Sequence, residues 1–248
     1  MAIIPLILLL ADFAFAEVDI DVGGEVIAGW EWDSREIYPN NEFYLRRLRA
    51  KIDGDFEHGF TAKMSFDLNS GFVELKDAEI VWEYGRPFEI GIGRRRKPFG
   101  IEEIYNLHDA PSADWSELRE LMDDTGYLDR DIGIWAFGKF FQEPYQIEYE
   151  IGLFNGHGGD AITSEKHFSS RFTYSPTKYL DIIGSYGTGL DTLGLIWHDA
   201  WGIGAVADPG NFEVGGEYTS GNDIVSGADF DGWHIWARYA IGNFTPYT

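Results

Sequence analysis

The sequence lacks several features that would place it in common protein classes. Its 248 residues contain no cysteine, which excludes a disulfide scaffold and a thiolate metal site. After the first dozen residues, no apolar run approaches the roughly 18–20 residues that a membrane-spanning helix needs. Basic residues number 19 against 42 acidic ones, and the net charge of −23 argues against a nucleic-acid partner. The six histidines show no metal-ligand spacing, so we expect no metal and no other cofactor.

The N-terminus has the pattern of a secretory signal. Residues 3–11 form a short apolar core, and Ala14-Phe15-Ala16 supplies small residues at the cleavage positions. The pattern predicts a signal peptide at residues 1–16 and a mature protein that starts at Glu17. No Lys or Arg precedes the apolar core, which leaves a start further upstream open. A buried strand or a short anchor helix is the alternative.

Alternation of apolar and polar residues dominates the rest of the chain. In residues 43–52, Arg47, Arg49 and Lys51 alternate with Leu48, Ala50 and Ile52. Because a strand sends successive side chains to opposite faces, this segment has one cationic and one apolar face. The same period predicts twelve strands, at 18–32, 42–54, 60–68, 72–84, 88–97, 130–141, 145–154, 167–175, 179–187, 193–206, 211–219 and 232–242.

These strands fit an all-β, antiparallel transmembrane β-barrel, with lipid on one face and water on the other. Tight turns that contain Pro or Gly mostly alternate with longer polar loops, at 33–41, 98–129, 155–166 and 220–231, although the short connection 69–71 breaks the rule. We therefore predict one barrel domain, residues 17–248. The alternative is a secreted, soluble β-sandwich that binds carbohydrate through exposed aromatic side chains, because sandwich strands also alternate.

Three segments resemble the phosphate-selective porin O/P family of Gram-negative outer membranes. They are 43–54 (FYLRRLRAKIDG), 93–100 (GRRRKPFG) and 128–158, and the resemblance covers most of residues 18–245. It implies a sixteen-stranded, homotrimeric barrel that passes small anions and contacts outer-membrane lipid and lipopolysaccharide. It also implies a third loop that folds inward to form the constriction.

The chain departs from this family pattern in two ways. Only twelve strands are predicted, and the final residues 243–248 lack the terminal aromatic of a complete outer-membrane barrel, so we expect a truncated member. In addition, Arg94 and Arg95 stand where the family has glutamine and phenylalanine. Selectivity for phosphate is therefore not carried over with the resemblance.

Two groups of basic residues are the candidate pore-lining, anion-binding sites. The first is Arg47, Arg49 and Lys51, and the second is Arg94, Arg95, Arg96 and Lys97, next to the long loop. Rows of Arg and Lys lower the barrier for anions, and a guanidinium matches two phosphate oxygens at once. The alternative is that these cations pair with acidic residues of the same face, of which Asp53, Asp77, Glu79 and Glu89 are candidates.

The long loop 98–129 is acidic. It contains nine carboxylates against the single basic residue Arg119, and residues 116–122 suit a short helix. If the loop folds inward, it would make one side of the constriction acidic or bind a divalent cation through oxygen ligands. The alternative, which we favour from sequence, is a solvated surface loop. Its adjacent carboxylate pairs are no sign of catalysis, since hydrolytic carboxylates face each other from separate elements. We therefore expect a passive porin for small anions rather than an enzyme.

Overall fold

The structure of the chain is a computed structural model that describes residues 18–32, 41–68, 71–105, 115–128, 130–142, 144–156, 166–191, 193 and 195–240. The expected signal peptide, residues 1–16, lies outside the described residues. So do the final residues 243–248 and most of the predicted loops 33–41 and 155–166. The chain divides into two compact units, which we call unit 1 (residues 1–83) and unit 2 (residues 84–248).

Twelve β-strands make up most of the described chain, which confirms the prediction from alternation. Their order in the sheet follows their order in the sequence, and the pairings described within each unit are antiparallel. The strands are β1 (Val18–Trp32), β2 (Asn41–Phe56), β3 (Phe60–Asp67), β4 (Glu74–Gly85), β5 (Phe88–Arg96), β6 (Arg130–Phe140), β7 (Gln146–Phe154), β8 (His167–Thr177), β9 (Leu180–Leu190), β10 (Trp197–Ala207), β11 (Phe212–Asn222) and β12 (Asp229–Tyr239).

Helices contribute little to the fold. The described residues contain the one-turn helices η2 (Glu57–Gly59) and η3 (Glu102–Ile104) and the α-helix α2 (Glu117–Asp124). Helix α2 confirms the short helix expected near residues 116–122. None of the helices in the described residues has the length and apolar character needed to cross a membrane.

Some predicted boundaries were wrong near the last connections. The predicted loop 220–231 is in fact a turn at residues 223–228, because β11 continues to Asn222 and β12 starts at Asp229. Asn222 lies opposite Asp229 in the register. Strands pair through their backbone groups. Polar and glycine residues can therefore extend a strand beyond the point at which the alternation of apolar and polar side chains ends.

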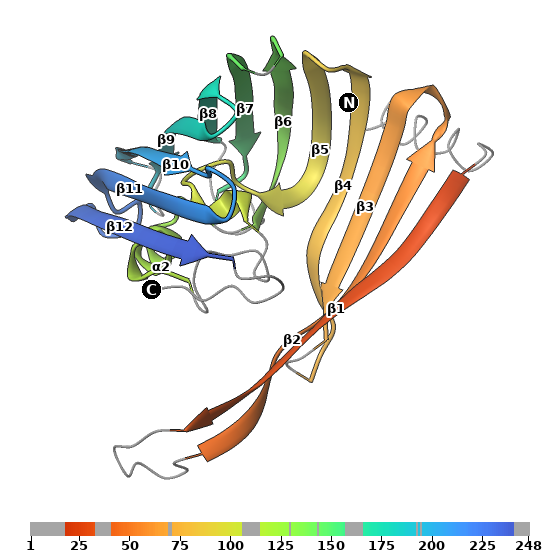
Figure 1. Cartoon of the computed structure of the whole chain (residues 1–248), viewed down its shortest axis with the longest axis horizontal. Coiled ribbons are helices and arrows are strands. Elements are labelled where there is room, and N and C mark those ends of the chain that lie inside the picture. The colour runs from red at the N-terminus through yellow and green to blue at the C-terminus, as the bar shows by residue number, and fades with distance from the viewer. Residues whose placement is uncertain are drawn as a thin grey trace. The chain divides into compact units, whose positions relative to one another are not determined.

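In unit 1, β2 is longer than its neighbour β3. It pairs with β1 along its whole length but with β3 only from Arg49 to Phe56. β1 and β2 therefore continue as a two-stranded ribbon beyond β3 (Figure 1). Arg49 is the first residue of β2 that pairs with a strand on each side, with Glu25 of β1 and Asp67 of β3.

In unit 2, β5 to β12 form a curved sheet with α2 close to β12 (Figure 1). The described parts of the long loop, residues 98–105 and 115–128, pack against one face of this sheet, and we call them the inner loop. Phe99, Leu118 and Met122 of the inner loop pack with Ala200 of β10 and Ile224. A second cluster joins Ile101 to Ile183, Val206 and Trp236 of the sheet. The apolar core of unit 2 therefore lies between the inner loop and the sheet.

The two faces of the strands have the reverse of the distribution found in a soluble protein. Val22 and Val26 of β1 are 77% and 67% exposed, and Trp233 and Ile235 of β12 are similarly exposed. Polar residues at the alternate positions are buried, among them Ser185, Glu213, Glu217 and Thr219. A large exposed apolar face is costly in water but is required against lipid. We call the two sides the apolar face and the polar face.

This arrangement does not support the β-sandwich alternative. A sandwich buries the apolar faces of two sheets against each other. The described strands instead belong to one sheet, whose apolar side chains are exposed and whose polar face is covered in unit 2 by the inner loop.

Candidate functional site

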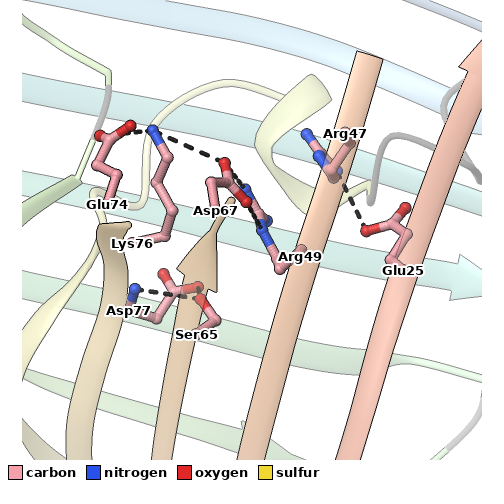
Figure 2. Close-up of polar contacts among 8 residues, drawn as sticks. All are labelled: Glu25, Arg47, Arg49, Ser65, Asp67, Glu74, Lys76 and Asp77. Carbon is pink, nitrogen blue, oxygen red and sulfur yellow. Dashed lines mark hydrogen bonds and ion pairs between the residues drawn. The ribbon is translucent and has the colours of Figure 1, made fainter. Parts of the chain in front are cut away.

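In unit 1, the predicted row of basic residues lies among carboxylates on the polar face of β1–β4. Arg47 Nη1 is 3.4 Å from Glu25 Oε2 of β1. Arg49 donates two hydrogen bonds to the Asp67 carboxylate of β3, at 2.6 and 2.8 Å (Figure 2). Arg49 is 6% exposed, so this two-pronged pair is screened little by water.

The polar contacts of unit 1 continue across β3 and β4. Lys76 Nζ lies 2.7 Å from Glu74 and 3.9 Å from Asp67, and the Ser65 hydroxyl donates to the buried Asp77 carboxylate (Figure 2). Lys51 lies opposite Gly23 and Ser65 in the register, on this same face. The row is therefore a mixed-charge ladder in which acids from neighbouring strands compensate the arginines.

In unit 2, the first part of the inner loop crosses the polar face of the sheet and is held there by hydrogen bonds. Ser169 of β8 donates to the Pro98 carbonyl, and Ser185 of β9 accepts from the Gly100 N–H at 3.0 Å. Glu217 of β11 accepts from the Ile101 N–H, also at 3.0 Å. Side chains from three strands thus satisfy the backbone groups of this segment and fix its path.

The second part of the inner loop is a capped helix tied to the first part. Ser116 is the N-cap of α2, and its hydroxyl accepts from the Arg119 N–H at 3.1 Å. The buried Glu102 carboxylate accepts from both the backbone and the hydroxyl of Ser116. Lys97 Nζ donates to the Gly126 carbonyl at 2.6 Å, which closes the base of the loop.

Tyr127 anchors the far end of the inner loop. Its hydroxyl donates to the Asn222 carbonyl at 2.7 Å, and its ring packs against Phe99 and Phe230. Burial raises the pKa of the Tyr127 phenol, and the negative charges of Asp199 and Asp223 raise it further. The neutral phenol is therefore the form that the anchor requires.

The inner loop is neither wholly inward-facing nor wholly solvated. Glu102 and Glu103 are buried, so the solvated surface loop favoured from sequence was wrong for this part. By contrast, Glu117, Glu120, Asp123 and Asp124 of α2 are exposed, as a solvated acidic helix would have them. In the described residues, no group of three or more acidic or histidine side chains is arranged to hold a metal ion.

Two carboxylates of unit 2 are each shared by two arginines. Glu150 of β7 forms ion pairs with Arg95 of β5 and, at 2.8 Å, with Arg171 of β8. Glu103 of the inner loop forms ion pairs with Arg119 at 2.6 Å and with Arg96 at 3.4 Å. Each group has two guanidiniums against one carboxylate, a formal charge of +1. We call them the Glu150 triad and the Glu103 triad.

Tryptophan rings orient both triads. The Arg95 guanidinium lies 4.8 Å from the centre of the Trp135 ring, and the Arg119 guanidinium lies 4.3 Å from that of Trp115. Such cation–π contacts attract the guanidinium to the face of the ring and favour its charged form. The arginines are also more exposed than the carboxylates: Arg95 is 25% exposed and Glu150 is 7% exposed at the side chain. A solute at this face meets the positive groups first.

The sequence profile of the phosphate-selective porins O and P matches residues 33–187, more than half of the chain. The chain belongs to the phosphate-selective porin O and P family. The matched region of this porin contains both basic groups predicted from sequence, the inner loop and the two triads.

Solved porin structures share the fold. A mutant of the Rhodopseudomonas blastica porin with five substitutions superposes with a TM-score of 0.59 and 15% identity, over 92% of this chain and 82% of that one. Two triple mutants of the same porin give TM-scores of 0.60, with 16% and 15% identity over the same shares of the chains. At this identity the likeness shows the fold alone. A search of curated proteins found no match.

The basic residues predicted at 94–97 of this porin do not act as one cluster. Arg95 and Arg96 belong to the two triads, and Lys97 is 5% exposed and anchors the inner loop. Arg94 lies opposite Ile132 in the register. The positive charges of Arg94 and Lys97 both act on the buried Asp131 carboxylate of β6.

The sequence did not lead us to predict Arg119 and Arg171 as site residues, nor Glu103 and Glu150, with which they form ion pairs. Arg171 occupies a polar position in the alternation of β8, which was a usable signal. Arg119 and Glu103 lie in a segment without strand periodicity, and only the folded path of the inner loop brings them together.

Proposed function

We propose that this porin lies in the outer membrane of a Gram-negative bacterium and lets small anions diffuse passively, phosphate among them. The exposed apolar face suits lipid, and the polar face suits a water-filled path. The predicted signal peptide at residues 1–16 supports export. No reaction is catalysed, and the solute gradient supplies the driving force.

The observation that carries the anion preference is the pair of triads. Each concentrates two guanidiniums around one buried carboxylate beside the inner loop, so each has an excess of positive charge. Rings of fixed Arg and Lys charges favour anions in a pore. The overall charge of −23 does not oppose this preference, because conduction depends on charges that the solute passes.

Phosphate is the anion whose chemistry best fits these groups. A guanidinium presents parallel N–H donors that match two oxygens of phosphate or carboxylate. The acidic face of α2, with Glu117, Glu120 and Asp123, acts against this preference. We therefore propose a moderate rather than an extreme selectivity for anions.

Membership of the family also supports a proposal about the partners of this porin. We propose a homotrimer surrounded by outer-membrane lipid and lipopolysaccharide. Chemical cross-linking of the protein in native outer membranes tests the trimer, and a product no larger than the monomer contradicts it.

Channel recordings test the proposed function. The purified full chain is added to planar lipid bilayers, and we expect stepwise increases in chloride current. Added phosphate should then reduce this current by competing for the triads, whereas equal ionic strength of a bulky sulfonate should not. A protein that remains soluble without detergent and produces no steps contradicts the proposal.

A further inference from the structure

One peptide group of the inner loop, between Gly100 and Ile101, lies between two side chains of opposite charge. Arg171 of β8 donates from Nη1 to the Gly100 carbonyl at 3.3 Å. Glu217 of β11 accepts from the Ile101 N–H at Oε2, at 3.0 Å. A peptide dipole has its negative end at the carbonyl and its positive end at the N–H. Each end of this peptide group therefore meets the charge that stabilises it.

Few other hydrogen bonds compete for these two side chains. In the described part of the chain, the Ile101 N–H is the only hydrogen-bond partner of the Glu217 carboxylate, whose other oxygen is buried. Among the same residues, the Arg171 guanidinium donates only to Gly100 and to Glu150. A guanidinium has five N–H groups, so three are left for a solute or for water. The Arg171 side chain is 15% exposed, which leaves it within reach of a solute.

The position of this peptide group matters for the whole inner loop. The Phe99 side chain before it is buried in the first apolar cluster, and the Ile101 side chain after it is buried in the second. The Gly100 N–H between them is bonded to Ser185 of β9. Packed clusters of this kind shift between discrete arrangements rather than deform continuously. The strength of the bond to the Gly100 carbonyl therefore bears on the docking of both clusters.

Arg171 connects this peptide group to the Glu150 triad. Its Nη2 is 2.8 Å from Glu150 while its Nη1 holds the Gly100 carbonyl. A guanidinium is planar and its donors keep a fixed geometry, so an anion that binds the remaining donors also fixes the direction of Nη1. Linkage is reciprocal: if the docked inner loop favours anion binding, the bound anion favours the docked inner loop by the same factor.

We propose that the Gly100–Ile101 peptide group couples anion binding at the Glu150 triad to docking of the inner loop. Phosphate bound at Arg171 tightens the inner loop on the sheet, and a loosened inner loop weakens phosphate binding. Arg171 and Glu217 are the positioning residues at the two ends of this link. The inference rests on the function proposed above and adds regulation to the same site, because the inner loop is held most firmly when an anion occupies the path.

Hydrogen–deuterium exchange of the detergent-solubilised full chain, with and without inorganic phosphate, tests this coupling. Phosphate should slow exchange in peptides that cover residues 98–105 by at least about fivefold, the lower end of typical coupling between sites. A bulky sulfonate at equal ionic strength should have no such effect. Peptides from β3 in unit 1 provide the reference, and their exchange should not respond to phosphate.

Three variants test the residues of the link. Arg171→Lys keeps the positive charge but not the fork of donors, so it should abolish the slowing by phosphate and largely keep the preference for chloride over potassium. Glu217→Gln keeps an acceptor for the Ile101 N–H without the charge, so it should speed exchange and lower the affinity for phosphate. Lys139→Gln is the matched control. It removes a cation of β6 that pairs with Glu148 at 2.8 Å, and it should respond to phosphate as the parent does.

The outcomes separate this inference from the proposed function, which chloride currents test on the same samples. If phosphate reduces the current but leaves exchange of residues 98–105 unchanged, the coupling is wrong and the proposed function stands. If phosphate slows exchange but leaves the current unchanged, the coupling stands and the proposed function is contradicted. The absence of both effects contradicts both. Equal slowing in Arg171→Lys and in the parent overturns the link through Arg171.

Discussion

Arg171 of β8 lies directly opposite Glu150 of β7, and its Nη2 is 2.8 Å from Glu150 Oε2. The same carboxylate also holds Arg95 from β5. A pair of residues that would be neutral by itself therefore becomes a group with an excess positive charge. Its carboxylate is more buried than its guanidiniums, so a solute meets the positive charge first.

Glu150→Gln should strengthen the preference for chloride over potassium. The change raises the charge of the Glu150 triad from +1 to +2, and a unit charge about 7 Å away in water contributes roughly 0.6 kcal/mol, or about threefold in permeability ratio. Arg171→Gln removes a positive charge and should shift the ratio by a similar factor in the opposite direction. Reversal potentials in a salt gradient measure both. If both variants shift the ratio in the same direction, the triad does not set selectivity.

Arg49 is expected to act mainly in the stability of unit 1. Arg49→Ala leaves the Asp67 carboxylate without its two-pronged partner, which should cost about 1–3 kcal/mol of folding free energy. Arg49→Ala combined with Asp67→Ala should recover part of that loss, because no charge is then left unpaired. Urea unfolding in lipid vesicles measures each variant. A double variant whose loss equals the sum of the two single losses shows that the pair is not coupled.

Gly100 allows the inner loop to turn onto the sheet. Its φ is +75°, and a Cβ at this position would lie 3.3 Å from Met122 Cε. Gly100→Ala should therefore strain the backbone by about 1–2 kcal/mol and displace the inner loop, which should alter single-channel conductance.

Gly210 provides the control for this prediction. It also has a positive φ, +102°, but no atom lies near its Cβ position, in a turn away from the inner loop. Gly210→Ala should cost similar backbone strain and leave conductance unchanged. Equal effects of the two substitutions on conductance would mean that the inner loop does not control the path.

The anchor at Tyr127 predicts an alkaline limit to the stability of the inner loop. Since burial raises the pKa of this phenol, its stabilising contribution is complete below the ordinary tyrosine pKa of about 10 and is lost as pH rises through the higher folded value. Protease cleavage within the inner loop should therefore increase above pH 10. Tyr127→Phe should remove this part of the pH dependence. The same pH profile in both proteins would show that another group is responsible.

The alternation of side chains was enough to predict the strands and their two faces, because each strand position is either apolar or polar in a two-residue period. The rule fails at the end of β5, where Arg96 is in line with Ile90 and Ile92 but forms an ion pair with Glu103 of the inner loop. The run of four basic residues suggested a single pore-lining site, whereas Arg95, Arg96 and Lys97 each belong to a different set of contacts.

The family resemblance implied that the long loop folds inward, but the path of the inner loop could not be predicted because it depends on contacts far apart in the sequence. Gly100 and Ser185, or Ile101 and Glu217, are joined by hydrogen bonds that no local pattern announces. The same holds for Glu103, whose two arginine partners come from β5 and α2. By contrast, the pairing of Arg49 with Asp67 follows from register, and a correct alignment of β2 with β3 would have found it.

The reversal potential of the unmodified porin in a tenfold gradient of potassium chloride tests the central claim most directly. The two arginine–carboxylate triads predict a potential shifted from zero toward the equilibrium potential of chloride. A potential shifted toward that of potassium would contradict the claim. It would mean that the exposed carboxylates of α2 and the acids of the polar face outweigh the paired arginines.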